Sequence, residues 1–104
     1  MSRDDAYLVD ILESAKIALA YVAGKSWDDF SGDIQCQDAV LRRLEIIGEA
    51  ARHISPQIPW RDMTLLRNLV IHQYDAVDIN QVWDTTQHKL TPLVAELSKI
   101  IPPE

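Results

Sequence analysis

The chain has 104 residues, of which 47% are hydrophobic and 25% charged, and its formal net charge at pH 7 is −6. This length and composition are typical of one globular domain with its own core, which we expect to span residues 1–104. The acidic balance argues against a general nucleic-acid-binding protein.

The single cysteine, Cys36, excludes an internal disulfide. The N-terminal residues lack the basic and then apolar order of a signal peptide. The uncharged apolar run over residues 17–24 is too short to cross a bilayer. We therefore expect a cytoplasmic protein without a membrane segment.

The first predicted helix begins at Asp4 and Asp5, whose carboxylates suit the positive end of a helix dipole. Gly24 is its expected end. Apolar residues at three- and four-residue spacing predict one buried stripe. This stripe consists of Leu8, Ile11, Leu12, Ala15, Leu19 and Val22.

Residues 26–33 are expected to form a connector that Trp27 and Phe30 hold against the body. A second helix is predicted over residues 33–54. Its expected buried side consists of Ile34, Leu41, Leu44, Ile46, Ile47, Ala51 and Ile54.

Prolines within residues 55–59 break the chain, and a third helix is predicted to begin near Trp60. A bend at residues 74–76 precedes Asp78, which can cap the next helix, and Pro92 should kink or restart that helix. The pattern predicts an all-α, up-and-down bundle of four or five helices. The inner side of its last part is expected to hold Ile79, Val82, Trp83, Thr86, Leu90, Leu93, Leu97, Ile100 and Ile101.

The third helix carries an unusual polar arc. At about 100° per residue, Arg67, Asn68, His72, Tyr74 and Asp75 share one side. The arc holds neither Glu nor Lys, which an ordinary solvated face would carry. The opposite side is apolar and consists of Met63, Leu65, Leu66, Leu69 and Val70.

This set of groups suits metal-independent cleavage of RNA. RNA carries its own nucleophile, the 2′-hydroxyl, and the imidazole of His72 can take that proton as a general base. The guanidinium of Arg67 can stabilise the charge on the phosphate, and Asn68 can orient His72 or hold a phosphate oxygen. Taken singly, each would more often be structural, for example Arg67 as an ion-pair partner of Asp62 or Asp75.

Basic residues are concentrated around this arc, since residues 41–74 hold five Arg and three acidic residues. Among them, Arg42 and Arg43 belong either to a solvated face or to a phosphate-facing patch. No metal site is expected, because Cys36 and the histidines His53, His72 and His88 lack the spacing of a zinc site. No catalytic role is expected for His53 or His88.

The spacing of Arg67, His72 and Tyr74, with four residues and then one between them, resembles the signature of the HepT-like toxins of the HEPN superfamily. The Arg67-Asn68 pair fits that pattern. Flanking segments agree with it in order, from about Ala39 to about Leu93. They are Leu44 to Ala50, Ile58-Pro59-Trp60, Val77-Asp78 and Val82-Trp83.

The resemblance implies an HEPN-like fold, a homodimer with two motifs facing one cleft, and Arg67 and His72 as the catalytic pair. It further implies that a MntA-type nucleotidyltransferase antitoxin attaches AMP to Tyr74. ATP and Mg²⁺ would be needed only by that partner, and the chain itself would need no cofactor. A second function is also possible: the chain could be a non-catalytic helical subunit that binds and regulates a nucleotidyltransferase. Arg67 and His72 would then be interface or structural residues. A bundle without any site is the third possibility.

Overall fold

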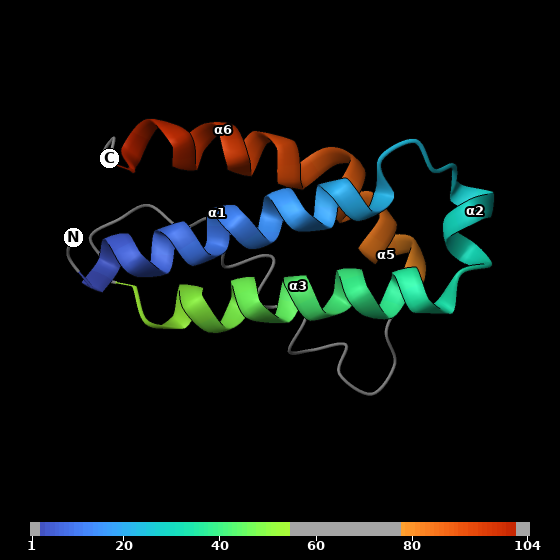
Figure 1. Cartoon of the computed structure of the whole chain (residues 1–104), viewed down its shortest axis with the longest axis horizontal. Coiled ribbons are helices and arrows are strands. Elements are labelled where there is room, and N and C mark those ends of the chain that lie inside the picture. The colour runs from blue at the N-terminus through green and yellow to red at the C-terminus, as the bar shows by residue number, and fades with distance from the viewer. Residues whose placement is uncertain (1–2, 55–77, 102–104) are drawn as a thin grey trace.

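The computed structural model describes residues 3–54 and 78–101, and every regular element in these two ranges is a helix (Figure 1). The predicted all-α class is confirmed. The third predicted helix lies outside the described residues, so the expected number of helices stays a prediction, as does the single domain. The described elements are α1 (Arg3–Val22), α2 (Trp27–Ser31), α3 (Ile34–Arg52), α5 (Ile79–Asp84), the π-helix η1 (Thr85–Lys89) and α6 (Leu90–Ile100).

Helix α1 is the central element, because α3 packs along one side of it and α6 along the other (Figure 1). Both neighbours run antiparallel to α1. The predicted apolar stripe of α1 explains this position, since Leu8, Ile11, Ala15 and Val22 are all buried. The core also takes side chains from the other helices, including Phe30, Val40, Leu44, Ile47, Val82, Leu90, Leu93 and Leu97.

The end of α1 was correctly predicted at Gly24. The helix stops at Val22, whose carbonyl accepts a hydrogen bond from the Lys25 backbone N–H over 2.9 Å. Gly24 has a φ of +75°, a left-handed conformation that residues with a Cβ rarely adopt. The chain can therefore turn away from α1 at this glycine.

The expected connector over residues 26–33 contains a short helix, α2, which periodicity did not predict. Five residues are too few for an apolar stripe to be recognised. A capping box starts the helix instead: the Asp29 backbone N–H donates to Ser26 Oγ, and the Ser26 N–H donates to the Asp29 carboxylate. As expected, Phe30 holds the segment to the body, since it is fully buried with its ring centroid 5.1 Å from that of Trp83.

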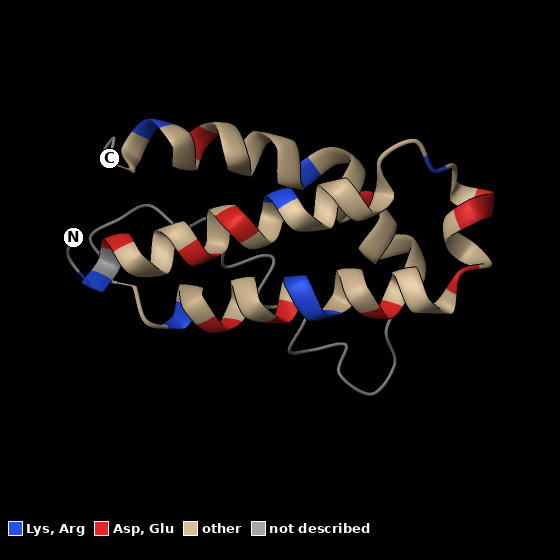
Figure 2. Cartoon of the chain, in the orientation of Figure 1, with Lys and Arg blue, Asp and Glu red and all other residues tan. Residues whose placement is uncertain are grey.

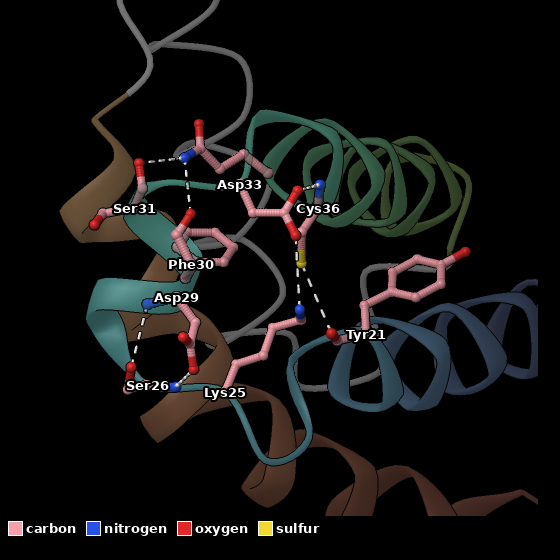
Figure 3. Close-up of polar contacts among 9 residues, drawn as sticks. Tyr21, Lys25, Ser26, Asp29, Phe30, Ser31, Asp33 and Cys36 are labelled. Carbon is pink, nitrogen blue, oxygen red and sulfur yellow. Dashed lines mark hydrogen bonds and ion pairs between the residues drawn. The ribbon is translucent and has the colours of Figure 1, made fainter.

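Several polar contacts fix α2 to the start of α3 (Figure 3). Gln37 Nε2 donates to the backbone oxygens of Phe30 at 2.8 Å and Ser31 at 3.1 Å. Asp33 caps α3 by accepting from the Cys36 backbone N–H at 3.0 Å, and its carboxylate also lies 3.6 Å from the Lys25 ammonium. These contacts join three consecutive segments into one corner of the bundle.

Two residues expected on buried faces are exposed, and these predictions were wrong. Ile34, the first residue of α3, is 71% exposed. It lies about 120° around the helix from the buried Val40, so it falls off the core stripe. Ile100 is 49% exposed because it is the last residue of α6, one turn beyond the buried Leu97.

The last helices form one run with an irregular turn inside it. Asp78 caps α5 as predicted, by accepting from the Asn80 backbone N–H at 2.9 Å. The expected disturbance at Pro92 lies upstream of it, in the π-helix η1, after which α6 begins at Leu90. A proline cannot donate to the carbonyl four residues earlier, and a π-turn rearranges the backbone bonds at that point. None of the helices in the two described ranges has the length and apolar character needed to cross a membrane.

Candidate functional site

The four residues predicted to form the site, Arg67, Asn68, His72 and Tyr74, lie outside the described residues. Their shared polar arc stays a prediction from the sequence. The structure does describe the helices on either side of this segment. Before it, α3 ends at Arg52, with His53 as its C-cap, and after it α5 begins at Ile79.

A cleft of about 430 Å³ lies between the first part of α1 and the last two-thirds of α3. Its volume is within the range of small-molecule pockets. The cleft is lined by Tyr7 and Asp10 from α1 and by Arg42, Ile46, Glu49, Ala50 and His53 from the α3 segment.

An aromatic pair forms one end of this cleft. The rings of Tyr7 and His53 are stacked, with centroids 5.1 Å apart and planes inclined by 19°. His53 is exposed and sits at the end of α3 as predicted, where a cationic side chain would suit the helix dipole. Sequence reasoning gave it no role and did not single out Tyr7, because the two are far apart in the chain and meet only through the antiparallel packing of α1 and α3.

The charged groups of the cleft are mixed. Arg42 is exposed, and its guanidinium lies 3.5 Å from the Glu45 carboxylate, a solvated pair one helical turn apart. Such pairs are weak, so the guanidinium can exchange Glu45 for another anion at little cost. Two carboxylates, Asp10 and Glu49, line the same cleft. Figure 2 shows acidic residues along α1 and α3, with basic ones in the middle of α3.

Arg42 and Arg43, expected on either a solvated face or a phosphate-facing patch, differ in exposure and position. Arg42 is exposed and lines the cleft, whereas Arg43 is half-buried and is not among the lining residues. Arg42 is therefore the one of the pair that can meet a ligand in this cleft.

Neither His88 nor Cys36 shows an arrangement suited to catalysis. His88 is an exposed residue whose Nε2 lies 3.8 Å from the Asp84 carboxylate. Cys36 is buried, and its thiol donates to the Tyr21 backbone oxygen over 3.7 Å. Burial raises the pKa of the Cys36 thiol, which disfavours the thiolate form needed for a nucleophile. Within the described residues, no cluster of three His, Cys, Asp or Glu side chains could hold a metal ion.

The comparisons with known proteins assign the family. The model described as "Ribonuclease HepT-like" matches residues 11–100. A protein named as a candidate RNase from Methanocaldococcus jannaschii is 35% identical over 103 residues, which is 92% of this chain and 85% of that protein.

Two further relatives agree. A protein named probable ribonuclease HepT from Thermococcus cleftensis is 36% identical over 101 residues, covering 90% of this chain and 92% of its own. A protein from Caldanaerobacter subterraneus, also named as a candidate RNase, is 30% identical over 94% of both chains. No solved structure gives a significant match. A family match that extends over most of the chain, with several relatives of similar length, shows that the chain belongs to the ribonuclease HepT-like family.

Proposed function

We propose that this chain is a metal-independent endoribonuclease that acts as the toxin of a toxin–antitoxin system in the cytoplasm. The observation that carries the proposal is the family match, which spans residues 11–100 and thereby includes the whole segment from Arg67 to Tyr74. That segment holds the general base and the fixed cation that such a reaction needs.

The proposed reaction uses the substrate's own hydroxyl. The imidazole of His72 takes the proton of the ribose 2′-hydroxyl as the 2′-oxygen bonds to phosphorus. The bond from phosphorus to the 5′-oxygen then breaks, and that oxygen takes up a proton. The guanidinium of Arg67 stabilises the additional negative charge on the phosphate in the transition state. The products are a 2′,3′-cyclic phosphate and a 5′-hydroxyl, and Asn68 orients His72 or a phosphate oxygen.

A homodimer completes the site in this proposal. One imidazole cannot readily serve as both the base for the 2′-hydroxyl and the acid for the leaving 5′-oxygen. Two copies of the motif across a shared cleft would supply two histidines and two arginines. Family membership supports this arrangement.

Regulation is proposed to act through Tyr74. A phenol has an unperturbed pKa near 10, so it is a poor base at neutral pH. Its oxygen can still lose its proton to solvent and bond to the α-phosphorus of an ATP that a MntA-type nucleotidyltransferase would hold with Mg²⁺, while the bond from that phosphorus to pyrophosphate breaks. The attached AMP brings a negatively charged phosphodiester close to Arg67 and blocks the place of the RNA phosphate.

The test compares purified wild type with Arg67→Ala and His72→Ala on single-stranded RNA in EDTA. We expect each substitution to reduce cleavage by at least a hundredfold, because it removes the base or the charge stabilisation. His88→Ala and Arg52→Ala are the matched controls, since both residues are exposed on described helices and should leave cleavage unchanged. Full cleavage by His72→Ala would contradict the mechanism with His72 as the base, and no cleavage by wild type would favour the non-catalytic regulatory subunit.

A further inference from the structure

We propose that the cleft between α1 and α3 binds a short segment of a single-stranded RNA and prefers bases that carry an exocyclic amino group. The proposal rests on the proposed function only in taking RNA as the ligand. It assigns a role to Tyr7, Arg42, Glu49 and His53, none of which belongs to the predicted catalytic motif.

An aromatic pair forms one end of the cleft. Tyr7 is half-buried and already stacked on His53 at 5.1 Å, so the tyrosine supports the imidazole from one side. His53 is exposed, so its side chain is accessible to a flat ligand. Proteins that bind single-stranded nucleic acid stack bases on exposed aromatic rings in this way.

Arg42 lies at the other end of the cleft. It is eleven positions before His53, which corresponds to about 16 Å along a helix axis. The cleft is thus long enough for a base at the His53 end and the backbone phosphate of a neighbouring nucleotide at the Arg42 end. Within the described residues, the only carboxylate that Arg42 contacts is that of Glu45, at 3.5 Å. This pair is solvated, so the guanidinium can readily exchange it for a phosphate.

Two carboxylates, those of Asp10 and Glu49, also line the cleft. Among the described lining residues they outnumber the one arginine, so a bare phosphate or a polyanion without base contacts is disfavoured. Carboxylates accept hydrogen bonds from base amino groups, as acidic side chains do with the amino group of cytosine. Adenine, cytosine and guanine carry such a group, whereas uracil offers a carboxylate only its ring N3–H on that edge. The charge pattern therefore favours an amino-bearing base over uracil.

The experiment measures fluorescence anisotropy of labelled ten-nucleotide oligo-A, oligo-C and oligo-U with the full chain. The His72→Ala background prevents cleavage during the measurement. We expect oligo-A and oligo-C to bind more tightly than oligo-U. His53→Ala and Arg42→Ala should each weaken oligo-A binding roughly tenfold, as expected for the loss of one stacked base or one phosphate contact. Glu49→Gln should bring the affinities for oligo-A and oligo-U closer together.

Matched controls exist on the same helices. Arg52→Ala removes an exposed arginine of α3 outside the cleft, and Tyr21→Ala removes a tyrosine of α1 that is 37% exposed and outside the cleft. Both should bind oligo-A within about twofold of the background protein. Circular dichroism confirms the helix content of every variant, and His53 and Arg42 are exposed enough that their loss should not prevent folding.

The outcomes separate this proposal from the nuclease. Cleavage that depends on His72, together with RNA binding that is unchanged in Arg42→Ala and His53→Ala, overturns the cleft and leaves the nuclease standing. RNA binding that depends on Arg42 and His53, without any cleavage by wild type, supports the cleft and overturns the proposed nuclease. No RNA binding at all also overturns the cleft. Cleft variants that change the oligomeric state in light scattering, with RNA affinity unchanged, would mark a subunit interface instead.

Discussion

Phe30 and Ile34 lie four positions apart, and their apolar side chains have opposite surroundings. Phe30 is fully buried in a cluster with the rings of Trp27 and Trp83, at centroid distances of 6.4 and 5.1 Å. Ile34 is 71% exposed at the start of α3. Burial, and not hydrophobicity alone, decides what each side chain contributes to stability.

Substituting these residues should show that difference. Phe30→Ala should lower the free energy of unfolding by about 3–5 kcal/mol, because it removes a buried ring and leaves a cavity. Ile34→Ala should change it by no more than about 0.5 kcal/mol. Urea denaturation followed by circular dichroism measures both values. Equal losses for the two variants would contradict the packing of α2 described above.

Tyr74 carries the regulatory part of the proposal. Tyr74→Phe should keep the nuclease activity and escape neutralisation, because it lacks the oxygen that accepts AMP. Co-expression with a MntA-type nucleotidyltransferase, followed by mass spectrometry, measures an adenylyl group on the peptide that contains residue 74. Tyr21→Phe is the control, since Tyr21 is a partly exposed tyrosine on α1. An unmodified Tyr74 peptide, or equal neutralisation of Tyr74→Phe, would leave an antitoxin that acts by binding alone.

At the scale of the element, α2 depends on its capping box more than on its length. The Ser26 backbone N–H and then the Ser26 hydroxyl lower the pKa of the Asp29 carboxyl below its ordinary value of 3.8. A carboxyl whose pKa is lower in the folded than in the unfolded state stabilises the fold at pH values above its unfolded-state pKa. That contribution is lost as the pH falls through the folded-state pKa. The start of α2 should therefore weaken only in acid, below about pH 4.

An NMR titration of the Asp29 side chain checks this. The midpoint should lie below 3.8 in wild type and move part of the way back in Ser26→Ala, which loses the hydroxyl but keeps the backbone donor. Ser31→Ala is the control, because the Ser31 hydroxyl donates to the Asp28 backbone oxygen. A wild-type midpoint at or above 3.8 would show that the cap is absent in solution.

The elements also show what the sequence could predict. Long amphipathic helices were predictable, since the buried stripe of α1 repeats over about four turns. The cap at Asp78 and the end at Gly24 were predictable from single residue types. Helix α2 was not, because its start depends on a local hydrogen-bond pair and its burial on contacts with the distant Trp83. The π-turn before Pro92 was expected as a kink at the proline itself.

For the whole molecule, the two candidate sites differ in how far sequence reasoning can find them. The residues from Arg67 to Tyr74 are close in sequence, so helix geometry alone predicts their common arc. The cleft between α1 and α3 joins Tyr7 to His53, which only the tertiary packing brings together. Because the chain has a net charge of −6, we expect the proposed RNA binding to depend on these few groups and not on a general basic surface.

In the proposed reaction the nucleophile is the substrate's own 2′-hydroxyl, so removing that hydroxyl should abolish cleavage. Purified wild type is incubated in EDTA with an RNA oligonucleotide, and with the same oligonucleotide carrying one 2′-deoxynucleotide at the cleaved position. Mass spectrometry of the products should show a 2′,3′-cyclic phosphate on the 5′ fragment of the RNA and no cleavage at the deoxynucleotide. A 3′-hydroxyl end, or equal cleavage at the deoxynucleotide, would show that water is the nucleophile and contradict the proposed mechanism.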